Sequence, residues 1–543
     1  MKWLAVLVLG VTQFLIVLDS SVMNVAISTL VDDFDTTVTQ IQTVIALYSL
    51  VMAALLMTGA KVGDLIGRKR ALMVGLAIYA VGSALTAVSW SVPSLIVGWS
   101  ILEGVGAALI LPALLALVSG NFKKERRIVA YAVIGAMAGV GIAVGPILGG
   151  FATTELSWRV VFYGEVALAL ILLASATRLK DAERTGKRPE LDVVGSLLSA
   201  GGVGLLVFGV LQSSTWGWVA PINSPIEPFG LSLVPFMIIG GGIVLWGFWS
   251  WEQRRVARRE DPLIQPKLLQ IPQMSAGLKT MVGQTLILGS VFFIIPLYLQ
   301  LVQGLSALDT GVRMLPVSIA MFITSLVGSR LATRFAPRTI VRIGLLILLI
   351  GIGTLLGTIE PELDGVDFAV AMALLGIGMG LMVSQLGNVV QSAVGPKDQS
   401  EAGGLSNAAQ QLGQAVGVAL IGSIVITILA GTFATQVANN PNIEPSLRQE
   451  ISIDLRTGVS FVSSEDVGAA ATDAGADSEL TAELVRNYED SQLVSLQTAL
   501  FVVSLIVLLT FFFTRQLPSE SPREAERKAA RKRKPRAAPR PAT

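Results

Sequence analysis

The stretch Gly59-Ala60-Lys61-Val62-Gly63-Asp64-Leu65-Ile66-Gly67-Arg68-Lys69-Arg70 joins two apolar runs, residues 40–60 and 71–90. Each run has about the 20 residues that an α-helix needs to cross a bilayer. The joining stretch carries four basic side chains, and short loops rich in Lys and Arg stay on the cytoplasmic side of a membrane. The stretch therefore predicts a membrane hairpin with its turn in the cytoplasm.

Twelve further apolar runs give the chain fourteen predicted crossings. The first run holds Asp19 near its middle and lacks the clean apolar core of a cleavable signal, so we expect a retained helix. The fold class that follows is an all-α polytopic membrane protein. The other runs lie near residues 4–30, 93–118, 128–152, 160–178, 192–212, 229–250, 276–300, 308–329, 338–359, 366–394, 402–432 and 493–514.

The distribution of basic residues supports this count. With both termini in the cytoplasm, the predicted inner loops, Lys2 and the tail after residue 514 hold 34 of the 40 basic residues. The short outer loops 31–39, 213–228, 301–307 and 359–365 hold none. An odd number of helices would destroy this asymmetry. We therefore predict a multi-pass protein of the plasma membrane, and the Ala/Arg/Pro-rich tail favours a bacterial inner membrane.

Composition excludes several kinds of chemistry. Hydrophobic residues make up 52% of the 543 and charged residues 14%, and the mean hydropathy is +0.68. The chain has no Cys and no His, which excludes disulfides, thiol catalysis, thiolate or imidazole metal ligands and a histidine proton relay. Proton chemistry must then use carboxylates, Lys, Arg or Tyr. We expect no cofactor, no metal and no nucleic-acid partner.

A weak internal repeat indicates a duplicated architecture. Residues 59–64 and 328–333 both end a predicted helix at a cytoplasmic loop, with Lys69 falling on Arg338. Two parallel halves that begin with the same helix–loop–helix are typical of transporters. The predicted domains are two six-helix bundles, 1–178 and 276–514, joined by a linker, 179–275, that carries two inserted helices, 192–212 and 229–250.

Two segments are expected outside the membrane. The outer loop 433–492 has eleven acidic residues and three arginines, and stretches such as 447–456 could form short surface helices. The tail 515–543 is strongly basic and is expected to be disordered in the cytoplasm. Attraction of this tail to anionic lipid is the alternative.

The opening stretch resembles the signature loop of the major facilitator superfamily, a Gly-x-Leu-Ala-Asp-x-x-Gly-Arg-Lys pattern between helices two and three. Ala60 and Val62 depart from it. A carboxylate and a basic cluster at helix ends can make ionic contacts that break when the two halves rock. The conformational gate implied by the resemblance comprises Gly63, Asp64, Gly67, Arg68, Lys69 and Arg70.

A second resemblance concerns the fifth helix. Its sequence matches in full the Gly-Pro-x-x-Gly-Gly motif of the superfamily's antiporters, which implies exchange rather than uptake. Glycines four apart leave a groove for a neighbouring helix, and a proline bends the helix that contains it. The motif residues are Gly141, Gly145, Pro146, Gly149 and Gly150.

The first helix resembles that of the fourteen-helix drug:proton antiporters through Leu18-Asp19-Ser20-Ser21-Val22-Met23-Asn24-Val25-Ala26. A carboxylate in the middle of the membrane is costly and usually serves a function. We predict that Asp19 takes part in proton coupling and that Asn24 lines the substrate cavity. A structural hydrogen bond to a neighbouring helix is the alternative role for this acid.

The fourth helix departs from that family. Where relatives have Arg-x-x-Gln-Gly, this chain has Ser100 and Glu103, so the role of the arginine cannot be transferred. Glu103 instead offers a second carboxylate in the membrane, with Trp99 one turn away. An acid beside an aromatic ring suits a lipophilic cation. We predict proton coupling for Glu103 and a place in the substrate cavity for Trp99 and Ser100.

The remaining candidates lie on later helices. Glu165, after Trp158-Arg159, is predicted as a third proton-coupling acid, with simple exposure to outer water as the alternative. The second half has no acid clearly at the membrane midplane and offers amides instead. Gln284, Asn407 and Gln411 are predicted to line the cavity, although hydrogen bonding between helices is an open alternative.

These features together predict a proton-driven exporter of amphipathic, cationic compounds that alternates between inward and outward states. Its partners would be a small-molecule substrate, protons and the lipid bilayer, and we expect a monomer. The same architecture also serves exporters of lipids, amino acids or antibiotics made by the host cell. A membrane enzyme or sensor is disfavoured because the loops show no phosphate cradle and no nucleophile elbow.

Overall fold

The computed structural model describes residues 2–122, 124–181, 190–361, 363–395, 398–440, 461–473 and 476–521. All regular secondary structure in these ranges is helical. Fourteen of the described helices are long and apolar enough to cross a membrane, judged by length and composition. The predicted number of crossings and the predicted all-α class are therefore confirmed.

The N-terminal half, defined here as α1 to α8, supplies six of these crossings. Short helices that are not α-helical carry the label η. The bounds are α1 Lys2–Val25, α2 Ile27–Asp33, α3 Val38–Ile66, α4 Arg68–Ala87, α5 Val92–Leu95, η1 Ile96–Glu103, α6 Gly104–Asn121, α7 Lys124–Phe151, η2 Ala152–Leu156 and α8 Arg159–Ala176.

The inserted hairpin and the C-terminal half supply the other eight crossings. The hairpin comprises α9 Val193–Leu211, α10 Ser213–Trp216, η3 Pro228–Gly230, α11 Leu233–Ala257 and α12 Pro266–Leu269. The C-terminal half comprises α13 Pro272–Leu297, η4 Tyr298–Val302, α14 Ala307–Arg313, α15 Leu315–Leu331, α16 Pro337–Leu356, α17 Gly365–Ser392, α18 Gln399–Asn439, α20 Ser464–Asp473, α21 Ser478–Phe513 and η5 Thr514–Gln516.

The segment expected as an outer loop, 433–492, is partly helical. Helix α18 continues to Asn439, and α21 begins at Ser478, before the predicted start of the last crossing. Asp477 caps the N-terminus of α21 by accepting a hydrogen bond from the backbone N–H of Leu480, at 2.8 Å. Polar residues can extend a membrane helix into water, which hydropathy alone does not detect. The expected surface helix at 447–456 and the tail beyond residue 521 lie outside the described residues.

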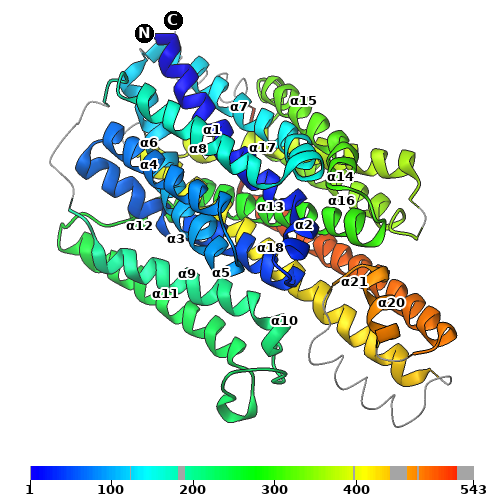
Figure 1. The fold of residues 1–543 in the computed structure, drawn as a ribbon. Coiled ribbons are helices and arrows are strands. Elements are labelled where there is room, and N and C mark those ends of the chain that lie inside the picture. The colour runs from blue at the N-terminus through cyan, green and yellow to red at the C-terminus, as the bar shows by residue number, and fades with distance from the viewer. Residues whose placement is uncertain are drawn as a thin grey trace, which may run out of the picture.

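The bundle has two ends, which we name by their loops. The signature end carries the Asp64–Arg70 loop, and α1 begins there (Figure 1). The opposite end carries α2, α14 and α20. At the signature end, Gly67 joins α3 to α4 with a φ of 106°, a backbone conformation that side chains disfavour. The glycine of the predicted gate motif is therefore required by the turn itself.

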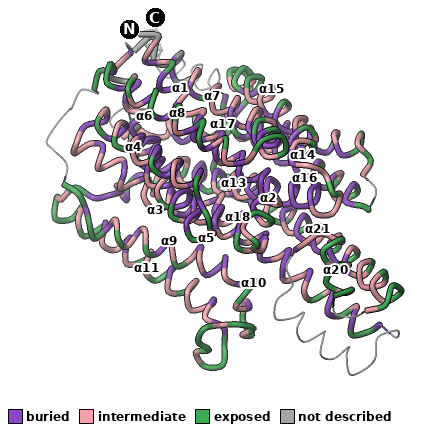
Figure 2. Tube along the Cα trace, in the orientation of Figure 1, coloured by how far each residue is buried: buried purple, intermediate pink, exposed green. Residues whose placement is uncertain are grey.

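The inserted hairpin lies along one flank of the bundle, where α9 packs against both α3 and α18 (Figure 1). The hydroxyls of Ser213 and Ser423 are hydrogen-bonded at 2.5 Å, and the backbone N–H of Gln265 donates to the carboxylate of Glu401. Burial is concentrated in the centre of the bundle, and α11 has a largely uncovered face (Figure 2). Such an apolar face suits contact with lipid.

Candidate functional site

Three acidic side chains predicted for proton coupling meet inside the N-terminal half. Asp19 comes from α1, Glu103 from the end of η1 and Glu165 from α8, and none is more than 2% exposed. One carboxylate oxygen from each lies within 4.8 Å of the others. At this separation two ionised carboxylates repel by about 3 to 4 kcal/mol at an effective dielectric constant near 20. The three groups therefore cannot ionise independently.

Each of the three carboxyls has a hydrogen-bond partner on another part of the half. The indole N–H of Trp99 donates to Asp19 Oδ1 at 2.6 Å. The hydroxyl of Tyr79 lies 3.3 Å from Glu165 Oε2, and that of Thr86 lies 3.0 Å from Glu103 Oε1. The alternative that Glu165 reaches outer water is wrong in this structure, because this residue is buried.

Aromatic packing encloses the cluster. The ring of Tyr48 is stacked on that of Trp99, with centroids 4.4 Å apart and planes 12° from parallel. The hydroxyls of Tyr48 and Ser83 are buried without a hydrogen-bond partner. Sequence reasoning missed Tyr48, Tyr79, Ser83 and Thr86, which lie on α3 and α4. Tyrosines and small hydroxyls are common in membrane helices, so only the rotation of these two helices reveals them.

The fourth crossing owes its local shape to a π-helix. Helix η1, Ile96–Glu103, contains both Trp99 and Glu103 and passes directly into α6. Wide turns of this kind occur frequently at functional sites because they change the direction of the side chains. Gly82 of α4 allows η1 to approach closely, since a Cβ at Gly82 would lie 2.6 Å from Cγ of Glu103. A substitution at Gly82 would displace the acid.

The residues predicted to line a substrate cavity have varied surroundings. Trp99 is 1% exposed and is bonded to Asp19, and Ser100 donates to the backbone oxygen of Val44 at 2.8 Å. Asn24 donates to the backbone oxygen of Ser20 at 2.7 Å, and the amide nitrogen of Gln411 lies 3.2 Å from the sulfur of Met52. Gln284 is buried and Asn407 is half-buried. Their place in a cavity stays a prediction.

The polar contacts of the signature loop lie within the N-terminal half, and its role as a gate stays a prediction. Arg68 and Asp64 form an ion pair. The backbone N–H of Lys69 donates to Asp181 at 3.0 Å, and its ammonium group donates to the backbone oxygen of Thr177. A Cβ at Gly63 would lie 3.1 Å from the guanidinium of Arg68, whereas Arg70 is exposed. The loop thus ties α3 and α4 to the end of α8.

The glycine motif of α7 serves two helix contacts at once. A Cβ at Gly141 or Gly149 would lie 3.0 Å from Val17 or Val22 of α1, and one at Gly145 would lie 2.4 Å from Ser21. On the other side, a Cβ at Gly150 would lie 2.4 Å from the backbone oxygen of Ala307 in α14. Pro146 takes part in the same contact, since its carbonyl lies 2.3 Å from a Cβ built on Gly311. The motif therefore lies where the two halves meet.

Hydrogen bonds between the halves occur towards the opposite end of the bundle. Gln300 accepts from Ser28 and donates to the backbone oxygen of Val25 at 2.8 Å. The backbone N–H of Leu308 donates to Thr154 at 3.1 Å. Gln42 donates to two backbone oxygens of α18, those of Val418 and Ala419, at 3.0 and 3.3 Å. These contacts hold the two halves together at that end.

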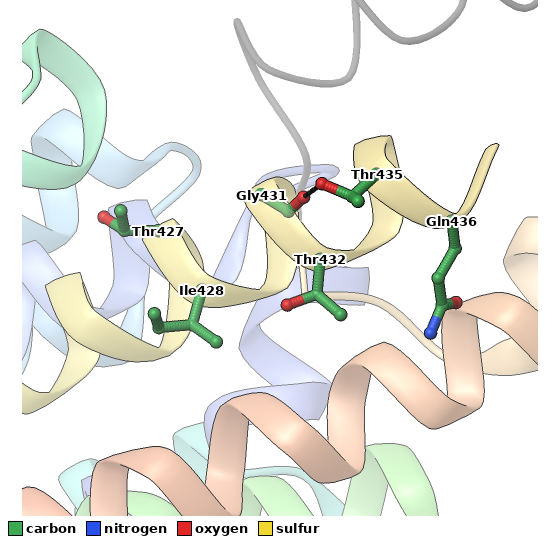
Figure 3. A pocket seen from close by; sticks show the side chains of 6 residues that line it. All are labelled: Thr427, Ile428, Gly431, Thr432, Thr435 and Gln436. Atoms are coloured by element: carbon green, nitrogen blue, oxygen red, sulfur yellow. Dashed lines mark hydrogen bonds between the residues drawn. The ribbon is translucent and has the colours of Figure 1, made fainter. Parts of the chain in front are cut away.

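A shallow hollow also lies on one face of α18, towards the opposite end (Figure 3). All of its lining residues come from this single helix, and the hydroxyl of Thr435 is already bonded to the backbone oxygen of Gly431 at 2.7 Å. The lining consists of Thr427, Ile428, Gly431, Thr432, Thr435 and Gln436. With no charged group and no contribution from the other half, this hollow lacks the features of a coupling site.

Comparison with known proteins gives a family assignment. Residues 9–418 match the family model described as Major Facilitator Superfamily. The chain belongs to the major facilitator superfamily. The resemblance predicted from the signature loop and the glycine motif is thereby confirmed, and the chain is a multi-pass membrane protein.

Several members of the superfamily are similar along most of their length. The puromycin resistance protein pur8 of Streptomyces alboniger is 32% identical, over 81% of this chain and 84% of the relative. A probable actinorhodin transporter of Streptomyces coelicolor is 30% identical, over 80% and 74%. The multidrug efflux pump LfrA of Mycolicibacterium smegmatis is 29% identical, over 78% and 80%.

Solved structures share the fold at low identity. A bacterial homologue of the human lysosomal transporter Spinster, inward-facing and unoccupied, has a TM-score of 0.61 at 13% identity, over 95% of this chain and 97% of that one. The human organic anion transporter MFSD10 has a TM-score of 0.57 at 14% identity, over 95% and 99%. The described helices therefore adopt the superfamily fold of two six-helix bundles, here with two inserted helices.

Proposed function

We propose that this protein is a proton-driven exporter of small amphipathic compounds that works by alternating access. The observation that carries the proposal is the buried cluster of Asp19, Glu103 and Glu165. A membrane protein tolerates three buried acids only where they are protonated, paired or in use. The relatives support export, since their names describe resistance, efflux and antibiotic transport.

In this proposal the cluster is the proton site, and the contacts between the two halves change as the protein alternates between states. Contacts at Gln300, Thr154 and Gln42 hold the opposite end closed. Each neutral hydrogen bond contributes only about 1 kcal/mol, so binding or release of protons can shift the balance between states. The signature loop would hold the other end in the alternate state.

We propose amphipathic cations as the substrate class, because the acids of the N-terminal half give it a negative site. A second candidate is an antibiotic made by the producing cell itself. That candidate is favoured by the names of two relatives from Streptomyces, the probable actinorhodin transporter and the tetracenomycin C resistance and export protein. In either case the protein acts as a carrier and not as an enzyme.

We further propose that the signature end faces the cytoplasm, which places both termini inside the cell in a bacterial inner membrane. The domain bounds 1–178, 179–275 and 276–514, the basic tail 515–543 and a monomeric state complete the proposal. The strong excess of Lys and Arg in the loops of the signature end supports this orientation.

The test is a proton-flux assay in liposomes that contain the purified protein, with a panel of quaternary ammonium dyes. The proposal predicts that a dye releases protons from the wild type and that Asp19→Asn and Glu103→Gln abolish this release. If both variants keep the release, these acids do not couple protons. If no dye acts on the wild type, the cationic substrate class is wrong, and the same assay with actinorhodin or tetracenomycin C tests the second candidate.

A further inference from the structure

Several buried polar atoms of the carboxyl cluster lack a hydrogen-bond partner. One oxygen of each acid accepts or shares a hydrogen bond, while Asp19 Oδ2, Glu103 Oε2 and Glu165 Oε1 are buried without a partner. The hydroxyls of Tyr48 and Ser83, 1% and 0% exposed, also lack one and lie against these acids. Buried polar atoms of a native protein are almost always paired. A protonated carboxyl carries an O–H that can supply such a partner.

Charge limits how many of these hydrogens are needed. With no proton, three mutual repulsions operate among groups within 4.8 Å. One proton leaves two charged neighbours, whereas two protons leave a single charge and remove every repulsion. The titratable groups that face the acids from α3 and α4 are Tyr48 and Tyr79.

The donors around Asp19 identify it as the ionised member. The indole N–H of Trp99 lies 2.6 Å from Oδ1, shorter than the usual 2.9 Å between neutral partners and typical of a charged acceptor. The hydroxyls of Tyr48 and Tyr79 also face this carboxylate. The short hydrogen bond from Trp99 stabilises the negative form of this carboxyl.

The one hydrogen-bond contact of Glu103 is compatible with a protonated acid. The hydroxyl of Thr86 lies 2.9 Å from the backbone oxygen of Gly82 and 3.0 Å from Glu103 Oε1. A hydroxyl has a single hydrogen, and a backbone oxygen can only accept. If Thr86 donates to Gly82, the shorter of the two contacts, Glu103 donates to Thr86 and is protonated; if Thr86 donates to Glu103, the acid accepts a single neutral hydrogen bond. The hydrogen bond of Glu165 is the longest of the three, 3.3 Å from the hydroxyl of Tyr79, and the hydroxyl of Ser83 lies near both glutamates.

We propose that Asp19, Glu103 and Glu165 form one site that stores two protons around a single negative charge, with Asp19 ionised and both glutamates protonated. This inference rests on the proposed function and makes it more specific. It gives the exporter a store of two protons per cycle. It also makes Trp99 a positioning residue of the proton site, which holds Asp19 in its charged form.

The test is infrared spectroscopy of the purified full-length protein at neutral pH, where the C=O stretch of a protonated carboxyl is separate from that of a carboxylate. We expect Glu103→Gln and Glu165→Gln each to remove the absorbance of one protonated carboxyl, and Asp19→Asn to remove none. Asp33→Asn is the matched control, because Asp33 is paired with Arg159 at 2.6 Å. It is also expected to remove none.

Two results would overturn the inference: a loss of protonated absorbance in Asp19→Asn, or no loss in either glutamate variant. Glu103→Asp and Glu165→Asp retain an acid and are expected to shift the absorbance instead, so the assignment does not depend on the folding of the Gln variants. The same preparations, placed in liposomes, separate the two proposals. Expected spectra without substrate-driven proton flux would contradict the exporter and leave the two-proton site standing.

Discussion

The two halves of the molecule share a fold but differ in what they bury. The N-terminal half buries three carboxyls close together. The C-terminal half buries amides: Gln385 of α17 donates to the backbone oxygen of Gly328 at 2.9 Å within that half, and Gln300 bonds across to the other half. Neutral amides bind neighbours without exchanging protons. In our proposal, proton coupling therefore belongs to the N-terminal half, while the C-terminal half supplies shape and hydrogen bonds.

The largest effect is expected from a substitution in the acid cluster of the N-terminal half, compared with one at a buried amide of the C-terminal half. Glu103→Gln should reduce dye uptake driven by a pH gradient to background, because the site loses a stored proton. The matched change Gln385→Leu removes one neutral hydrogen bond, worth about 1 kcal/mol, and should reduce uptake less than about tenfold. Uptake into inside-out vesicles measures both. Equal losses in the two variants would contradict the division between the halves.

Much of this division could be predicted from the sequence. Asp19, Glu103 and the amides of the second half stand out in apolar runs, and the helix count follows from hydropathy and loop charge. The meeting of the three acids could not be predicted. It depends on the π-helix at 96–103, which changes the direction of Trp99 and Glu103, and on how α4 is rotated about its own axis. Neither leaves a pattern in one sequence.

A second prediction concerns the contact of α1 with α7, which positions Asp19. Gly145→Ala places a Cβ 2.4 Å from that of Ser21, so α1 must shift. Overpacking of this kind costs about 1 to 3 kcal/mol. We expect a lower Tm and a loss of proton-driven uptake. Gly135→Ala on the same helix is the control, because nothing lies within 4 Å of its added Cβ. An unchanged Tm in Gly145→Ala would show that this packing is looser than described.

A third prediction tests the hydrogen bonds between the two halves. Gln42→Leu removes the hydrogen bonds to α18 and should shift the equilibrium towards opening at that end by up to about tenfold. Since the chain has no native Cys, spin labels at Asp35→Cys and Glu360→Cys can report the distance between the halves. The control Gln497→Leu breaks a bond within the C-terminal half, to the backbone oxygen of Ile359. If Gln42→Leu leaves this distance unchanged, the hydrogen bonds of Gln42 do not hold that end closed.

The smallest effect is expected at Asp32, at the opposite end and outside the predicted crossings. Partial loss of water and the nearby carboxylate of Asp466 raise the pKa of Asp32. Its ionised form therefore costs stability at pH values above the raised pKa, and this cost disappears as the pH falls below about 4. Asp32→Asn should raise the Tm slightly at pH 7 and leave it unchanged at pH 3. Asp35→Asn is the control. A lower Tm at pH 7 would contradict the sign.

The most direct test compares two modes of transport in Asp19→Asn and in Gln284→Leu. In liposomes, one arm measures dye accumulation driven by a pH gradient, and the other measures dye exchange across the membrane with no gradient. We predict that Asp19→Asn loses gradient-driven accumulation and keeps exchange, whereas Gln284→Leu changes both modes in the same proportion. Gradient-driven accumulation that persists in Asp19→Asn, with exchange at the wild-type rate, would contradict proton coupling in the N-terminal half.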